Sequence, residues 1–250
     1  MKLLISITTL PNRMKSEFFK KVIESIINQK HIEELKILLY IPIQCNRFPD
    51  IEYDLNDLNG LENKLWIHRG IDYGPASKFL SIFNNLESIK IYNFTHILIC
   101  DDDIILRENI LFRMIKKLPY HSEYSIWTNG SLHKLKNISI VEGYSGILIP
   151  MNWFTQYYDY DKKFIHYIMN ELTIHNKCYN VDDILLSFFI YKSKISVYST
   201  GFNPFYDWMD RTLTDTHPEW FELCKNTDRD KNNLNLNCLF YLENIYKNFH

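Results

Sequence analysis

One apolar run that ends in three consecutive aspartates constrains the fold of this chain more than any other feature. Residues 97–100 carry no charged interruption, lie between two helical patterns and are followed directly by Asp101, Asp102 and Asp103. Such a run predicts a strand that is buried on both faces of a parallel sheet. Because the ligands of open α/β sheets lie beyond the carboxyl ends of the strands, we expect the triplet at a binding crevice.

The triplet also has the chemistry of a site for a hard divalent cation. Three carboxylates at one strand end repel one another unless a cation or hydrogen-bond donors compensate them. Alternate side chains of an extended segment point the same way, so Asp101 and Asp103 are expected to face one Mg²⁺ or Mn²⁺ ion while Asp102 turns into the protein. The alternative is a solvated turn that caps the following helix, whose pattern begins near Glu108.

The order of the predicted elements indicates the fold class, which is a three-layer α/β/α sandwich with a mostly parallel central sheet. In the first half of the chain, strand and helix patterns alternate almost regularly. They predict strands at 2–7, 35–41, 65–69 and 97–100, and helices near 16–27, 79–86 and 110–115. The largely polar stretch 44–63 is expected to be a long surface excursion.

The second half of the chain has shorter patterns. They predict strands at 125–128, 138–141, 146–150 and 195–199, and helices at 164–172, 184–191 and 238–245. No internal repeat or low-complexity linker interrupts the sequence. We therefore expect one domain over residues 1–250, in which 1–118 form a nucleotide-binding half and 119–250 form an acceptor half.

The net charge and the cysteine content limit the classes of partner and the cellular compartment that we expect for this chain. The formal net charge is −2 and there is no basic stripe, which argues against a nucleic-acid partner. No apolar run approaches the length of a membrane span. The five cysteines are odd in number, widely spread and free of C-x-x-C pairs. We therefore expect neither a disulfide framework nor a zinc site, and a reducing compartment, the cytoplasm.

Three polar segments are expected to meet at one crevice, because each follows a strand of the first half. Segments 8–13, 72–78 and 101–103 offer hydroxyls, a guanidinium, an ammonium and carboxylates, a set that suits a nucleoside diphosphate. The predicted donor-binding side chains are Thr8, Thr9, Arg13, Asp72, Lys78, Asp101 and Asp102. The alternative for Arg13 and Lys78 is a solvated helix surface.

These segments carry a family resemblance. Residues 6–13, 72–78, 101–103, 142–146 and 182–183 resemble, in this order, the small GT-A glycosyltransferases found in bacteria and in algal and giant viruses. The match runs from the first predicted strand to the last. It implies a nucleotide-diphosphate sugar donor, a Mn²⁺ or Mg²⁺ ion that bridges the donor phosphates, and transfer of the sugar to a hydroxyl of a glycan or other acceptor. For a viral member the compartment would be the host cytoplasm.

Two aspartates are candidates for the catalytic base. Asp182 and Asp183 begin a predicted helix, where a carboxylate can take the proton of an acceptor hydroxyl. The base of inverting GT-A enzymes is similarly placed, so the resemblance implies an inverting enzyme with Asp183 as the base and Asp182 as the second candidate. Alternatively, both aspartates only complement the helix dipole.

The remaining candidates lie in loops. Gly143, Tyr144 and Gly146 belong to a segment whose backbone can approach a sugar, although glycines that only permit a turn are an equal alternative. His217 is a candidate metal ligand, because GT-A enzymes often take a histidine from the C-terminal part of the chain. A histidine in a polar loop is otherwise simply exposed.

Two other function classes stay open from the sequence alone. In a phosphohydrolase similar to the haloacid dehalogenases, Asp101 would be the nucleophile, but that family places its D-x-D after the first strand. A non-catalytic carbohydrate-binding module would have no use for Lys78 beside a metal and phosphates. The donor sugar, the nucleotide base and the acceptor are not specified by any motif of the sequence.

Overall fold

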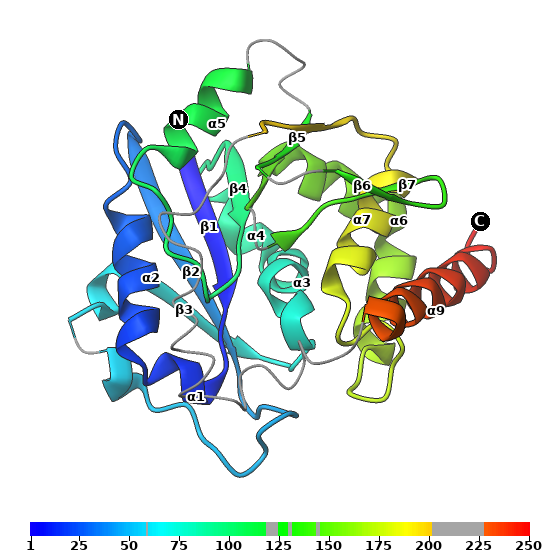
Figure 1. The fold of residues 1–250 in the computed structure, drawn as a ribbon, viewed down its shortest axis with the longest axis horizontal. Coiled ribbons are helices and arrows are strands. Elements are labelled where there is room, and N and C mark those ends of the chain that lie inside the picture. Colours follow the sequence, from blue (N-terminus) through cyan, green and yellow to red (C-terminus); the bar gives the residue numbers. More distant parts are fainter. Residues whose placement is uncertain (59, 119–124, 130–131, 144–145, 202–227) are drawn as a thin grey trace.

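A computed structural model describes residues 1–58, 60–118, 125–129, 132–143, 146–201 and 228–250. Within these ranges the strands form a seven-stranded sheet in the order β3-β2-β1-β4-β8-β5-β9 and a separate β6-β7 hairpin (Figure 1). The strands are β1 Lys2–Thr8, β2 Glu34–Pro42, β3 Leu65–Gly70, β4 His96–Ile99, β5 Ile126–Thr128, β6 His133–Leu135, β7 Ile138–Ile140, β8 Ile147–Pro150 and β9 Val197–Ser199.

Helices cover both faces of the sheet. The α-helices are α1 Pro11–Met14, α2 Glu17–Ile27, α3 Ser77–Asn84, α4 Leu86–Lys90, α5 Ile110–Lys117, α6 Met151–Glu171, α7 Asp182–Lys192 and α9 Asp228–Tyr246. Three short 3₁₀ helices are η1 Leu55–Leu58, η2 Glu62–Lys64 and η3 Gly74–Ala76. The predicted strands and helices of the first half are therefore confirmed, with boundary shifts of a few residues.

The sheet is mostly parallel, as predicted. Strands β3, β2, β1 and β4 are parallel to one another, β8 is antiparallel to both β4 and β5, and β9 is parallel to β5. The chain passes from β1 to β2 on one side, and β4 then pairs with β1 on the other side. The order of the strands thus reverses between β1 and β4, which is where open α/β sheets bind ligands.

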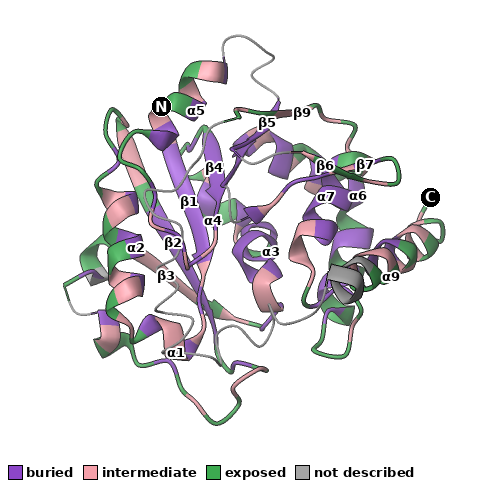
Figure 2. Ribbon diagram, viewed as in Figure 1, coloured by how far each residue is buried: buried purple, intermediate pink, exposed green. Residues whose placement is uncertain are grey.

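Two apolar cores lie on opposite faces of the sheet and confirm the three-layer sandwich. One face of β1 packs with α2 and α5, and the other face packs with α3, α6 and α7. Figure 2 shows the buried residues concentrated along β1, β4 and α3, and exposed residues on the outer sides of α2 and α9. Ser16 caps α2, because its hydroxyl accepts a hydrogen bond of 3.1 Å from the Phe19 N–H.

Three predictions for the second half are wrong, two about where a helix begins and one about a strand. Helix α6 begins at Met151 rather than near residue 164, because Trp153, Phe154 and Tyr157 bury an aromatic face that polar neighbours conceal in the sequence. Helix α9 begins at Asp228, ten residues before the prediction. Strand β6 lies in a stretch expected to be a polar loop, because it pairs with β7 across a tight turn.

The cysteine prediction is also wrong. Cys178 and Cys238 form a disulfide, with their Cα atoms 4.8 Å apart and a separation of 60 positions in the chain. The spacing of the cysteines in the sequence does not predict this pair, because the two thiols meet only where α9 packs near the segment before α7. Cys45 and Cys100 are buried and free. In the described part of the chain, no helix is long and apolar enough to cross a membrane.

Candidate active site

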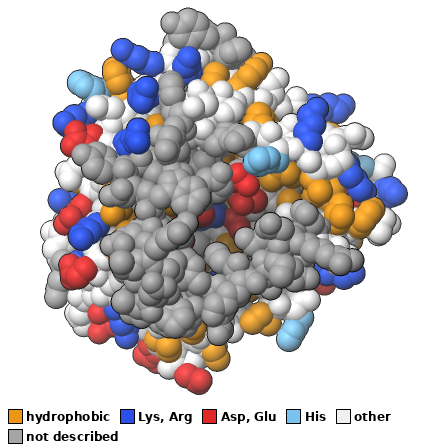
Figure 3. All heavy atoms as spheres, viewed as in Figure 1, with side chains coloured by type: hydrophobic (Ala, Val, Ile, Leu, Met, Phe, Trp, Pro, Cys, Tyr) orange, Lys and Arg blue, Asp and Glu red, His pale blue; other side chains and the backbone are white. Residues whose placement is uncertain are grey.

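Polar side chains from the segments after β1 and β4 and from the first turns of α3 and α7 meet at the carboxyl ends of β1 and β4. The triplet directly follows β4, and the segment that carries Thr9 and Arg13 follows β1. Because the two strands are adjacent and parallel, their ends bring these segments together. Figure 3 shows one group of acidic side chains near the middle of the molecular face in view. Below, the acidic cluster denotes Asp101, Asp102, Asp103, Asp182 and Asp183 with the two cations Arg13 and Lys78.

Asp102 turns into the protein, as predicted. Its carboxylate accepts a hydrogen bond of 2.6 Å from the Thr9 hydroxyl and pairs with the guanidinium of Arg13. The same guanidinium lies 3.3 Å from Asp103. The Thr9 hydroxyl and one terminal nitrogen of Arg13 therefore bind the triplet itself and hold it in place.

Lys78 is buried inside the cluster, in the first turn of α3. Its ammonium pairs with Asp101 at the end of β4 and, at 2.6 Å, with Asp182 at the start of α7. The side chain is only 5% exposed. The alternative of a solvated Lys78 is therefore wrong, because its ammonium is buried between two carboxylates.

Asp183 accepts a hydrogen bond of 2.8 Å from the backbone N–H of Gly143. The close approach needs glycine, because a Cβ at position 143 would lie 2.7 Å from the Lys78 Nζ and 3.0 Å from an Asp101 oxygen. Gly146 has a φ of +80°, a backbone conformation that favours glycine. The backbone of Gly143 thus lies against the cluster.

The cluster carries more negative than positive charge. Desolvation and repulsion by Asp102 and Asp101 raise the pKa of Asp103 to about 6, although Arg13 opposes the shift. Burial and the neighbouring Asp182 raise the pKa of Asp183 well above its usual value. Burial alone would lower the pKa of Lys78, but Asp101 and Asp182 raise it well above the usual value. The cations therefore stay charged.

The residues that are present fit a divalent cation. Asp101 and Asp103 have side chains that are 30% and 34% exposed, whereas that of Asp102 is 8% exposed. Five carboxylates face two cations in the cluster, so the cations do not balance the acidic groups. Among the described residues, no three His, Cys, Asp or Glu side chains are grouped to hold an ion by themselves. The set thus suits Mg²⁺ or Mn²⁺ with further ligands from water and substrate phosphates.

Some predicted site residues lie elsewhere. The Thr8 hydroxyl donates a hydrogen bond of 2.8 Å to the carbonyl oxygen of Tyr40, so it ties β1 to β2. Asp72 is buried and accepts hydrogen bonds from Asn46, from Gly74 in its own turn and from Tyr179, and none of these three belongs to the acidic cluster. Tyr144 and His217 lie outside the described residues.

The sequence analysis missed two features of the site. It preferred Asp183 to Asp182 as the base but did not predict their different contacts: Asp182 forms an ion pair with Lys78, and Asp183 accepts a hydrogen bond from the Gly143 N–H. It also missed Tyr179, which is fully buried and hydrogen-bonded to Asp72. Its position three residues before Asp182 was the only available signal.

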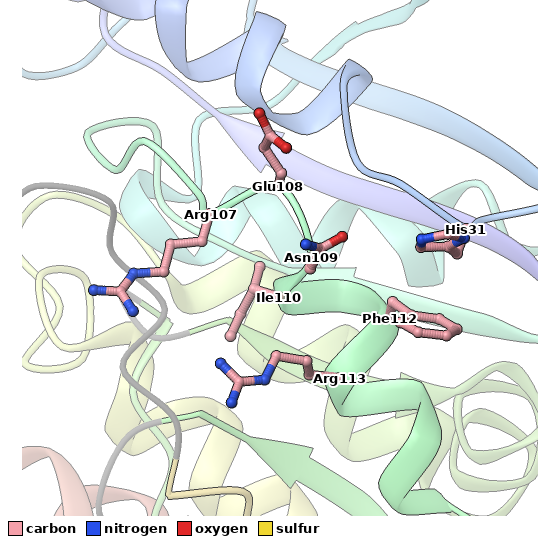
Figure 4. Close-up of a pocket in the computed structure, with 7 residues that line it drawn as sticks. All are labelled: His31, Arg107, Glu108, Asn109, Ile110, Phe112 and Arg113. Carbon is pink, nitrogen blue, oxygen red and sulfur yellow. The ribbon is translucent and has the colours of Figure 1, made fainter.

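A separate cavity of about 700 Å³ lies beside the start of α5 (Figure 4). In Figure 4, the guanidinium groups of Arg107 and Arg113 lie on one side of it, and His31 and Phe112 lie on the other. None of the residues that line it belongs to the acidic cluster. The cavity is therefore distinct from the candidate site.

No protein-family model and no curated protein matches the sequence. Solved structures do match its fold. Residues 1–349 of S. aureus TarS align with a TM-score of 0.51 and 13% identity, over 91% of this chain and 66% of that chain. Francisella tularensis 2-C-methyl-D-erythritol 4-phosphate cytidylyltransferase aligns with a TM-score of 0.49 and 8% identity, over 88% of this chain and 99% of that chain. The galactosyltransferase LgtC in complex with donor and acceptor sugar analogs aligns with a TM-score of 0.45 and 11% identity, over 94% of this chain and 83% of that chain.

The chain thus spans slightly less than two thirds of the TarS chain that it matches. At 13% identity, the likeness to TarS concerns the fold alone. It agrees with the predicted class, a mixed α/β structure around a mostly parallel central sheet of the GT-A-like kind.

Proposed function

We propose that this protein is a glycosyltransferase that moves a sugar from a nucleotide-diphosphate sugar to an acceptor hydroxyl, with the help of Mn²⁺ or Mg²⁺. The observation that carries the proposal is the acidic cluster at the point where the strand order reverses. There, Lys78 joins the strand-end Asp101 to Asp182 of α7. The GT-A-like fold and the order of the sequence motifs support the same function.

The donor diphosphate binds at the exposed side of the triplet. Asp101 and Asp103 have the exposed carboxylates and are the proposed metal ligands. When bound, the ion neutralises the diphosphate and so stabilises it as a leaving group. Arg13 and Lys78 keep the carboxylates in place, while Thr9 fixes Asp102 behind them.

Asp183 is the proposed base. As the acceptor oxygen forms a bond to the anomeric carbon, its proton passes to the Asp183 carboxylate, and the electrons of the breaking carbon–oxygen bond leave with the nucleoside diphosphate. This direct displacement inverts the anomeric configuration. The raised pKa makes the Asp183 carboxylate a stronger base than an ordinary aspartate. Asp182 is less suited, because Lys78 engages its carboxylate.

The acceptor lies against Gly143 in this proposal. The Gly143 backbone adjoins both Lys78 and Asp183, so an acceptor hydroxyl placed there is close to the base. Tyr144, which the sequence analysis places in the same loop, is the proposed stacking partner for the acceptor sugar.

A panel of nucleotide sugars tests the proposal. We expect at least one of them to bind only with Mn²⁺ or Mg²⁺ and to be hydrolysed slowly when no acceptor is present. A phosphohydrolase would instead release phosphate from phosphomonoesters, and a carbohydrate-binding module would bind glycans without any nucleotide. Either of these outcomes, with no nucleotide-sugar turnover, would overturn the proposal.

A further inference from the structure

A second connection, outside the acidic cluster, joins the segment before α3 to the segment before α7. The Tyr179 hydroxyl donates a hydrogen bond of 3.0 Å to Asp72. The same carboxylate accepts 2.6 and 2.7 Å hydrogen bonds from the backbone N–H groups of Asn46 and Gly74. Asp72 is 8% exposed and Tyr179 is fully buried. One carboxylate therefore holds three chain segments together.

The backbones of the two segments also touch at this point. Gly74 has a φ of +59°, and a Cβ at that position would lie 2.8 Å from the carbonyl oxygen of Tyr179. The Arg47 guanidinium lies over the Tyr179 ring, 5.8 Å from its centroid, and donates a 2.7 Å hydrogen bond to Asn180. Tyr179 is thus enclosed on several sides and has little freedom to move.

The position of Tyr179 is passed on to the start of α7 through consecutive turns. The N–H of Val181 binds the carbonyl of Cys178 at 3.2 Å, and the N–H of Ile184 binds the carbonyl of Val181 at 3.0 Å. Residues 179–182 are therefore held at both ends by residues 72–78, once through Tyr179 and Asp72 and once through Asp182 and Lys78.

We infer that Tyr179 is a positioning residue: its hydrogen bond to Asp72 fixes the start of α7, so that Asp183 faces the reacting groups. The inference rests on the proposed function and assigns Asp72 to this support rather than to direct contact with the donor. Displacement of a base by about 1 Å is enough to reduce turnover by up to about 100-fold. The hydroxyl of Tyr179 therefore matters for turnover more than for donor binding.

The test compares Tyr179→Phe with the matched variant Tyr40→Phe. Tyr40 is 2% exposed, and its hydroxyl donates a 2.9 Å hydrogen bond to the carbonyl of Ile71, next to Asp72 but without any link to α7. Both variants lose one buried hydroxyl. We expect Tyr179→Phe to lower kcat by about 10-fold to 100-fold with KM for the donor within about twofold, and Tyr40→Phe to change neither by more than about twofold.

A second readout does not depend on activity. We expect the amides of Ile184 and Leu185 to exchange hydrogen faster in Tyr179→Phe than in Tyr40→Phe, because both bind the carbonyl of Val181. If the wild type transfers no sugar, the proposed function fails, and the exchange rates alone decide the positioning role. Equal kcat losses in the two variants, or unchanged exchange at the start of α7 in Tyr179→Phe, would overturn the inference.

Discussion

The two cations of the acidic cluster hold different kinds of neighbours. Arg13 binds Asp102 and Asp103, which are adjacent in the sequence, and its side chain is 17% exposed. Lys78 binds Asp101 and Asp182, which come from opposite halves of the chain, and its side chain is 5% exposed. The Arg13 side therefore organises one strand end locally, whereas the Lys78 side connects β4, α3 and α7.

This difference indicates which side of the acidic cluster supports the fold and which side can contact a ligand. On the Lys78 side, the buried ammonium pairs with both Asp101 and Asp182, although Asp101 keeps 30% of its side chain exposed. On the Arg13 side, Asp103 lies farther from the guanidinium and keeps a third of its side chain exposed. A ligand that carries a cation can therefore reach Asp103 most easily. Loss of the Lys78 ion pairs should lower the stability of both halves of the molecule, because they join β4 to α7.

The largest effect is expected from removal of the buried ammonium. Lys78→Met leaves Asp101 and Asp182 without their partner and should lower the free energy of unfolding by about 3–5 kcal/mol. Arg13→Met should cost less, about 1–3 kcal/mol, because Asp102 keeps the Thr9 hydroxyl and Asp103 reaches water. Denaturant titration of both variants measures the difference. A larger loss in Arg13→Met would reverse the comparison.

The next effect separates the two aspartates of α7. Asp183→Asn keeps the side-chain oxygen that accepts the Gly143 N–H, so stability and donor affinity should hold while turnover falls by about 10²-fold or more. Asp182→Asn weakens the Lys78 ion pair and should mainly reduce stability.

Melting temperature and transfer rate on one preparation of each variant distinguish these roles. If Asp183 were only a charge at the helix terminus, its replacement would cost about 0.3–1 kcal/mol and leave turnover unchanged. In that case Asp182 would be the next candidate for the base.

The smallest effect concerns Asp103 and pH. Because the pKa of Asp103 is raised to about 6 in the fold, the folded state holds this proton more tightly than the unfolded chain, whose carboxyl has a pKa of about 3.9. The stabilisation is complete below pH of about 4 and is lost as the pH rises through about 6. In EDTA, Asp103→Asn should therefore melt higher than the wild type at neutral pH, with a smaller difference in acid.

Added Mn²⁺ is the control for that prediction. It should raise the melting temperature of the wild type at neutral pH more than that of Asp103→Asn, since a bound ion stabilises only the state that binds it. A wild type and variant that respond equally to Mn²⁺ would remove Asp103 from the metal site.

Local patterns of the sequence were enough to predict which residues lie at the ends of the first strands. The apolar run before the triplet predicted β4, and the alternation of side chains in an extended segment predicted that Asp102 turns inward. The parallel order of the first strands then placed the segments after β1 and β4 at one edge of the sheet. These features depend on neighbours in the chain or on adjacent strands.

The missed features depend on contacts between distant segments. The Tyr179–Asp72 hydrogen bond joins residues 107 positions apart, and the disulfide joins Cys178 to Cys238 across 60 positions. Burial of Lys78 likewise results from the approach of α7 to β4. No local periodicity encodes such approaches, so the sequence supplied the candidate residues but not their partners.

The most direct test of the account is calorimetric titration of the wild type with uridine diphosphate and with guanosine diphosphate, in Mn²⁺ and in EDTA. The triplet and the diphosphate repel each other unless a cation lies between them. We therefore predict tight binding of one nucleotide in Mn²⁺ and at least a 100-fold weaker affinity in EDTA, about 2.7 kcal/mol. Equal affinity in the two buffers, or no binding of either nucleotide in Mn²⁺, would contradict the account.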